Sequence, residues 1–204
     1  MTRPNIAFAV NKLSQFMHAP TMTHCGAVKR FLRSLNGTKD FGINLSSNTP
    51  VTLHGFSDAD WGGNPDDRTL IGAYVIFLGA NPISWSSTKQ RTVVRSSTEA
   101  EYRAIASAAA KLEWLKSLLL DLGVKFSKPP VIYSDNLGAT YLSANPDFHS
   151  QMKHLAIDYH FVHDFLQSNA LRVVHVSGAE QLPDCFSCVP RLVSLMEHHL
   201  EGAY

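Results

Sequence analysis

Hydrophobic positions recur at two different spacings, and the change falls near residue 50. Before it, apolar residues three and four apart predict a helix over residues 3–17 and a second helix that begins at Thr21 or Thr23 and ends at Asn36-Gly37. Asp40–Leu45 is expected to be a short strand and Ser46–Pro50 a linker. Because two short helices enclose too little core to be stable alone, residues 1–45 are expected to be a small helical appendage.

After residue 50 the pattern changes to short apolar runs separated by turn residues. The first three runs predict strands with short connections: Val51–Asp58, Leu70–Leu78 and Pro82–Trp85. The remaining runs predict helices and two further strands: Ser97–Leu122, Val131–Ser134, Asn136–Ala144, Met152–Gln167, Leu171–Val176, Pro183–Cys188 and Arg191–Leu200. Three meandering strands followed by strands that helices connect indicate an α/β fold, with a mixed sheet flanked by helices.

Composition narrows the class of protein. The 204 residues are 45% hydrophobic and 10% aromatic, as in a globular protein with a proper core. The net charge of +1 gives no general preference for nucleic acid, so any such binding needs a local basic patch. Three scattered cysteines argue against a disulfide framework, and no apolar run reaches membrane-spanning length. We expect a soluble protein of the cytoplasm or nucleus.

Two acids end the first predicted strand, where a carboxylate is costly to bury unless a cation neutralises it. They are Asp58 and Asp60, and the pattern alone does not decide between them. Asp135 follows another strand, at the edge of an α/β sheet where sites form, although an aspartate before a helix is often only its N-cap. Asp184 follows Pro183 at the start of a late helix, where an exposed acid is the simpler interpretation.

The long helix separates two acids that lie close together in the sequence. Its apolar stripe passes through Ile105, Ala108, Leu112, Leu115 and Leu119, and one turn further back it reaches Glu101. Glu99 lies about 200° away around the helix, on the polar side with Arg103. The pattern therefore predicts that Glu101 faces the core and Glu99 faces solvent. An acid that complements the dipole of the first helical turn is the equal alternative for Glu101.

Several short motifs resemble the ribonuclease H domain of copia-class retrotransposon polyproteins, in the same order and at similar spacing. They are Ser57-Asp58-Ala59-Asp60-Trp61, Ser96-Ser97-Thr98-Glu99-Ala100-Glu101-Tyr102, Ser134-Asp135-Asn136, and Lys153-His154 followed by Asp158-Tyr159-His160-Phe161. Residues 2–45 resemble the tail of the reverse transcriptase that precedes this domain. The resemblance implies a helical reverse-transcriptase remnant over residues 1–45, a linker over 46–50 and an RNase H-like domain with a five-stranded mixed sheet over 51–204.

The resemblance also implies an activity, namely hydrolysis of the RNA strand of RNA–DNA hybrids with two Mg²⁺ ions, for which Mn²⁺ can substitute. The acids that would bind the metals and act in catalysis are Asp58, Glu101, Asp135 and Asp184. Carboxylate oxygens suit Mg²⁺, and two metals stabilise both the attacking and the leaving oxygen of an in-line displacement. The residues expected to contact nucleic acid are Ser96, Ser97, Thr98, Lys89, Arg91, Arg95, Asn136 and His154. For the three basic residues, an ordinary solvated loop is the equal alternative.

Other partners are a reverse transcriptase or further segments of a polyprotein. No polymerase motif of the Tyr-x-Asp-Asp type occurs, which excludes a polymerase. The family pattern continues after its fourth acid with Thr-Lys and a proline, whereas this chain reads Cys185-Phe186-Ser187-Cys188-Val189-Pro190. A second hypothesis therefore stays open, in which a catalytically weak or inactive RNase H-like protein binds a protein or nucleic acid.

Overall fold

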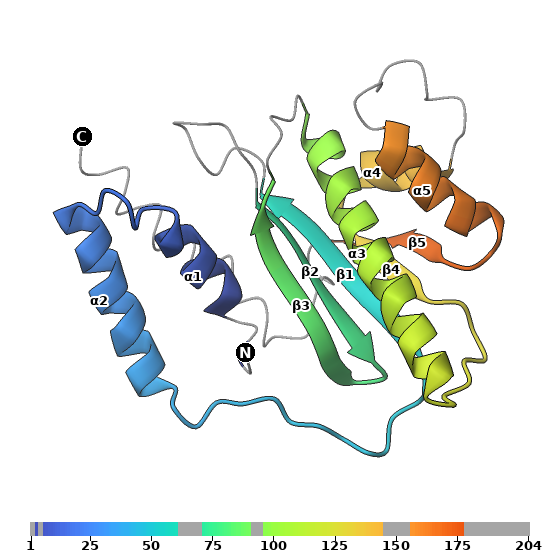
Figure 1. The fold of residues 1–204 in the computed structure, drawn as a ribbon, viewed down its shortest axis with the longest axis horizontal. Helices are drawn as coiled ribbons and strands as arrows, with labels where there is room; N and C mark the ends of the chain where they lie inside the picture. Colours follow the sequence, from blue (N-terminus) through green and yellow to red (C-terminus); the bar gives the residue numbers. More distant parts are fainter. Residues whose placement is uncertain (1–2, 4–5, 61–70, 91–95, 145–155, 178–204) are drawn as a thin grey trace. The chain divides into compact units, whose positions relative to one another are not determined.

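The computed structural model describes residues 3, 6–60, 71–90, 96–144 and 156–177 (Figure 1). The chain divides between Asn44 and Leu45 into two compact units. The first unit contains two helices, α1 (Ala7–Ser14) and α2 (Met22–Gly37). The Thr21 hydroxyl caps α2 by accepting from the backbone N–H of His24, and the His24 ring accepts from the backbone N–H of Thr21. The structure thus places the start of this helix at Thr21 rather than Thr23.

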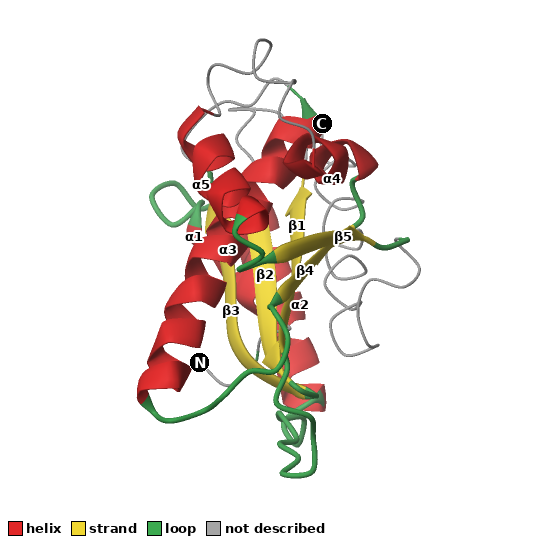
Figure 2. Ribbon diagram, turned by 90° about the vertical axis from the view of Figure 1, so that its right-hand side faces the viewer, coloured by secondary structure: helices red, strands yellow, loops and turns green. Residues whose placement is uncertain are grey.

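The second unit contains all the strands of the described chain, and its sheet has the order β3-β2-β1-β4-β5 (Figures 1 and 2). The strands are β1 (Leu53–Asp60), β2 (Ile71–Leu78), β3 (Asn81–Lys89), β4 (Val131–Ser134) and β5 (Arg172–His175). β1, β2 and β3 form an antiparallel meander, whereas β4 is parallel to both β1 and β5. The predicted fold, an α/β protein with a five-stranded mixed sheet, is confirmed.

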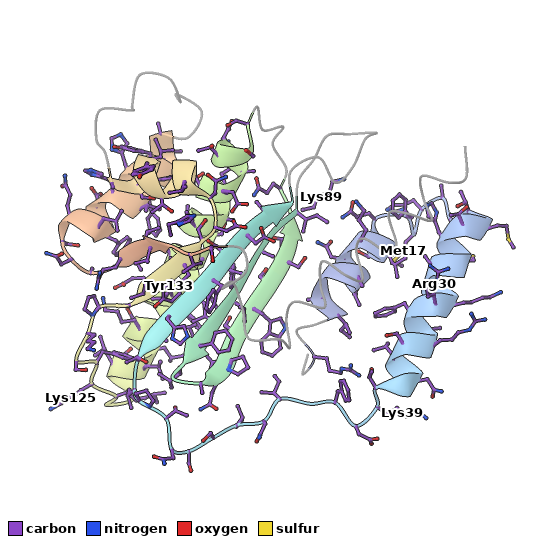
Figure 3. All side chains as sticks on the ribbon, turned by 180° about the vertical axis from the view of Figure 1, so that it is seen from behind. Met17, Arg30, Lys39, Lys89, Lys125 and Tyr133 are labelled. Atoms are coloured by element: carbon purple, nitrogen blue, oxygen red, sulfur yellow. The ribbon has the colours of Figure 1, made fainter. Side chains whose placement is uncertain are left out.

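Three helices of this unit pack together beside the sheet: α3 (Ser97–Asp121), α4 (Leu137–Ala144) and α5 (Ala156–Gln167). The predicted apolar stripe of α3 is buried, and it packs on β1 and β2 in one core with Leu53, Ile76 and Ile132. Along β1 the alternate residues Leu53, Ser57 and Ala59 are buried. Their neighbours His54 and Phe56 contact the rings of Phe77 and Tyr133 instead (Tyr133 is labelled in Figure 3).

Two predicted strand ends and one whole predicted strand were wrong. β1 continues to Asp60 because its pairing with β2 extends through Asp60↔Ile71. β3 continues from Trp85 to Lys89, because β2 pairs with its polar end as far as Ile71↔Lys89. The strand predicted over Asp40–Leu45 does not form, since none of the described strands pairs with these residues.

Other predictions fall outside the described residues, namely the helices at 183–188 and 191–200 and the start of the helix predicted from Met152. Within the described residues, no helix combines the length and apolar character that crossing a bilayer requires.

Candidate metal centre

The central strand, β1, extends past the end of its parallel neighbour β4. The last pair between them is Phe56↔Tyr133, so the final residues of β1 have no strand on that side. The backbone N–H of Ala59 points into this gap, where it donates to Glu101 Oε1 over 3.1 Å. A glutamate of α3 therefore takes the place of the missing strand partner.

Asp135 enters the same gap from the end of β4. Its neighbour Ser134 is fully buried, and the Ser134 hydroxyl accepts from the backbone N–H of Asn136 at 3.3 Å. Nε2 of His175, the last residue of β5, donates to the backbone carbonyl of Asp135 over 3.1 Å. Because β4 and β5 are parallel, the end of each strand contributes to holding Asp135.

Three acids from separate elements converge at this gap. Asp58 on β1, Glu101 on α3 and Asp135 after β4 each offer a carboxylate oxygen, and the three oxygens lie within 4.8 Å of one another. Glu101 is only 6% exposed, whereas Asp58 and Asp135 are exposed. The cluster thus has a buried acid at its base and two accessible acids at its rim.

Burial and neighbouring charge disturb the ionisation of Glu101. Burial, which has the largest effect, and the nearby carboxylates of Asp58 and Asp135 together raise the pKa of its carboxyl from 4.5 to about 8. The backbone N–H of Ala59 opposes the rise by donating to the ionised form. At neutral pH, the folded chain without a cation therefore keeps a proton on Glu101 that the unfolded chain has already released.

The donor set fits a hard divalent cation. All three side chains supply oxygen, which Mg²⁺ and Mn²⁺ prefer over nitrogen or sulfur. Glu101 Oε2 is buried, and in the ionised form no described residue donates a hydrogen bond to it. Such an orphaned oxygen is costly unless a partner satisfies it. A cation between the three acids would satisfy this oxygen and neutralise their mutual repulsion.

Glu99 corrects one expectation of the helix pattern. It was predicted to face solvent, but it is only 7% exposed. Its Oε1 accepts from Arg103 Nη2 over 3.2 Å, one turn along α3. Burial raises the pKa of Asp158 on α5, and the Arg103 guanidinium opposes that rise, which places this cation near both acids. Glu99 is thus a structural acid on the flank of α3 away from the candidate centre.

Of the five described residues predicted to contact nucleic acid, four lie at the two helix starts beside the acids and one lies at the end of β3. Ser96 caps α3 by accepting from the backbone N–H of Glu99, and Asn136 Oδ1 accepts from the backbone N–H of Ala139 in the first turn of α4. Ser97 is exposed at the first position of α3. Lys89 ends β3 at the same end of the sheet as Asp60, because Ile71 pairs with both residues (Figure 3).

The structure does not describe Asp184, Arg91, Arg95 or His154. Their roles, like the nucleic-acid contacts of the other five residues, stay predictions. Two contacts at the centre had no signal in the sequence. Every residue except proline has a backbone N–H, so the residue type of Ala59 does not indicate that it donates to Glu101. The hydrophobic pattern also gives no sign that Thr98 contacts Gly138.

Thr98 and Gly138 bring the first turns of α3 and α4 into direct contact. A Cβ atom added to Gly138 would lie 2.8 Å from Thr98 Oγ1 and 3.2 Å from Thr98 Cγ2. Only a residue without a side chain leaves room for Thr98 here, so the spacing of the two helix starts beside Glu101 and Asp135 depends on this glycine.

We therefore expect Gly138→Ala to lower the free energy of unfolding by about 1–3 kcal/mol through overpacking, despite the better helix propensity of alanine. Urea unfolding measures the change. The double variant Thr98→Ala/Gly138→Ala removes the obstructing side chain and should recover most of the loss. A single variant as stable as the wild type would show that the helices separate freely.

No family model matches the chain. The chain is 58% identical over 183 residues to the retrovirus-related Pol polyprotein from transposon RE1 of Arabidopsis thaliana. The match covers 90% of the chain but 12% of that protein, so the chain spans about an eighth of this relative's length.

Solved structures with the same fold are far less similar in sequence. LC11-RNase H1, isolated from compost, is 16% identical with a TM-score of 0.51, over 74% of this chain and 99% of that one. The foamy viral protease-reverse transcriptase in complex with an RNA/DNA hybrid is 11% identical with a TM-score of 0.51, over 75% of this chain and 22% of that one. Both similarities support the fold alone.

Proposed function

The chain belongs to the retrovirus-related Pol polyproteins of copia-type transposons as an RNase H-like domain, and on that premise we propose that it hydrolyses the RNA strand of RNA–DNA hybrids in a metal-dependent reaction. The observation that carries the proposal is the convergence of Asp58, Glu101 and Asp135 within 4.8 Å, with a buried carboxylate oxygen that lacks a partner. No nucleophilic side chain is needed for this chemistry.

Each acid has a separate task. Glu101 is fixed by the Ala59 N–H through one oxygen and offers the other to a cation. Asp58 and Asp135, which are exposed, hold the cation at the rim where a phosphodiester can approach. Two divalent ions, when bound, would supply an activated water and stabilise the attacking and leaving oxygens. Asp184 is proposed as a fourth ligand from the sequence.

Recognition of the hybrid is proposed to rest on shape and on the ribose. The wide minor groove of A-form nucleic acid displays 2′-hydroxyls, which polar side chains can bind. Ser97 and Asn136, beside the acids, are suited to hydroxyl or phosphate oxygens, and Lys89 to a phosphate further along the sheet edge. The foamy viral protease-reverse transcriptase, which is similar in fold, has been solved in complex with an RNA/DNA hybrid, the class of substrate proposed for this chain.

The test is a cleavage assay with the full chain and RNA labelled at its 5′ end. We expect cutting when the RNA is paired with DNA in Mg²⁺ or Mn²⁺, and no cutting in EDTA or when the same RNA is paired with RNA. Asp135→Asn should remove the activity. Asp158→Asn changes a half-buried acid outside the cluster and should retain it.

Cutting that persists in EDTA, or in Asp135→Asn, would contradict the proposed centre. A chain that binds the hybrid but never cuts it would support the alternative, a binding module with this fold.

A further inference from the structure

Gln90, the residue after β3, reaches from the sheet to the first turn of α3. Its Nε2 donates to the backbone carbonyl of Ala100 over 3.3 Å. The opposite amide orientation would bring two oxygens together, so the bond fixes which end of the amide faces the helix. The side chain passes directly over β2, because a Cβ atom added to Gly72 would lie 2.9 Å from Gln90 Nε2.

This contact lies where alanines of α3 pack on β1. Ala59, Ala100 and Ala104 form a small buried cluster of their own, in which short side chains let the helix lie close on the strand. Ala59 pairs with Gly72 in the sheet, so Gln90 lies over the neighbour of this cluster. Ala100 directly precedes Glu101, whose Oε1 binds the N–H of Ala59. The Gln90 amide thus binds the residue that directly precedes the buried acid of the candidate centre.

The amide makes this contact at a cost. Gln90 Oε1 is buried, and it has no hydrogen-bond partner among the described residues. A buried carbonyl oxygen without a partner destabilises a fold. An apolar side chain of the same length would avoid that cost, so the amide donor to Ala100 is the feature that distinguishes glutamine here.

We propose that Gln90 is a positioning residue for Glu101. Its amide fixes the rotation and height of the first turn of α3 over β1, so that the Glu101 carboxylate is held ready for a divalent cation with Asp58 and Asp135. Gly72 belongs to the same device because it leaves the space in which the amide lies. The inference rests on the proposed metal-dependent function.

The experiment measures Mn²⁺ binding to the full chain by isothermal titration calorimetry. Gln90→Met keeps the length of the side chain and removes the donor, and it should weaken Mn²⁺ binding about tenfold, as loss of a supporting hydrogen bond does at metal sites. Gly72→Ala should cause a similar loss by displacing the amide. In a Gln90→Ala background, Gly72→Ala should have no further effect, since the amide it displaces is gone.

A structural role alone would change stability and leave metal affinity unchanged. Urea unfolding is therefore measured for each variant, with Gln167→Met at the exposed end of α5 as the matched control. In the cleavage assay, kcat of Gln90→Met should fall at limiting Mn²⁺ and return at saturating Mn²⁺.

The role of Gln90 would be overturned if Gln90→Met or Gly72→Ala bound Mn²⁺ as tightly as the wild type, or if Gly72→Ala had equal effects in both backgrounds. Neither outcome would contradict the proposed function. Absence of Mn²⁺ binding by the wild-type chain would overturn the proposed function and this inference together.

Discussion

Asp58→Asn is expected to lower metal-dependent hydrolysis by about a thousandfold or more, because metal ions supply several kcal/mol of transition-state stabilisation and each 1.36 kcal/mol is tenfold in rate. The same change should raise the unfolding temperature of the chain in EDTA. Asp58 lies with Glu101 and Asp135 in a cluster of like charges within 4.8 Å, and its charge raises the pKa of Glu101. Removing that charge relieves repulsion in the metal-free protein.

Asp58→Asn should thus lower hydrolysis but raise the stability of the metal-free chain, a combination that distinguishes a functional acid from a structural one. Glu99→Gln is the control, since Glu99 is a buried acid that pairs with Arg103 and does not belong to the cluster. It should lower stability through the lost ion pair and leave hydrolysis largely intact. An Asp58→Asn variant that is less stable than the wild type in EDTA, or that still cuts the hybrid, would contradict the arrangement.

The second large effect is a loss of stability of the metal-free chain as the pH rises. The pKa of Glu101 is about 8 in the folded chain against 4.5 ordinarily, so folding favours the protonated form. The stabilisation is complete below about pH 4.5 and is lost as the pH rises through 8. At 1.36 kcal/mol per pKa unit, the full change amounts to about 5 kcal/mol.

Trp85 and Trp114 belong to the unit that contains the sheet, so their fluorescence during urea unfolding reports on that unit. In EDTA, the free energy of unfolding should fall between pH 5 and pH 9, and saturating Mg²⁺ should reverse most of the fall. Glu101→Gln should flatten the dependence, whereas Glu99→Gln should not. An unchanged slope in Glu101→Gln would assign the proton to another group.

The hydrophobic pattern of the sequence was sufficient to predict burial where a residue's position on one face of a helix decides whether it is buried. The stripe through Ile105, Leu112 and Leu115 is buried as predicted, and it correctly placed Glu101 on the core side. The same pattern failed for Glu99, which is buried and paired with Arg103 on the flank where α3 contacts α5. Periodicity along one helix contains no information about a neighbouring helix.

Strand ends were misplaced for a related reason. The acids of β1 and the serines of β3 resemble turns when read alone, yet β2 supplies backbone partners for both. Hydrogen bonds of the peptide group do not depend on side-chain polarity, so a polar strand end is visible only once its neighbour is known. Because β1 continues to Asp60, Asp58 lies within the strand, where its backbone is fixed by the sheet.

The hydrogen bond between Ala59 and Glu101 links the end of the central strand to the proposed cation site. The Glu101 carboxylate accepts a hydrogen bond from the end of β1 through one oxygen and would bind a cation through the other. Formation of this hydrogen bond and binding of the cation are therefore energetically coupled. By reciprocity, if a bound cation strengthens the hydrogen bond between Ala59 and Glu101 by some factor, formation of that bond strengthens cation binding by the same factor. The amide proton of Ala59 is therefore a natural probe, whose exchange rate would read out occupancy of the centre without a nucleic-acid substrate.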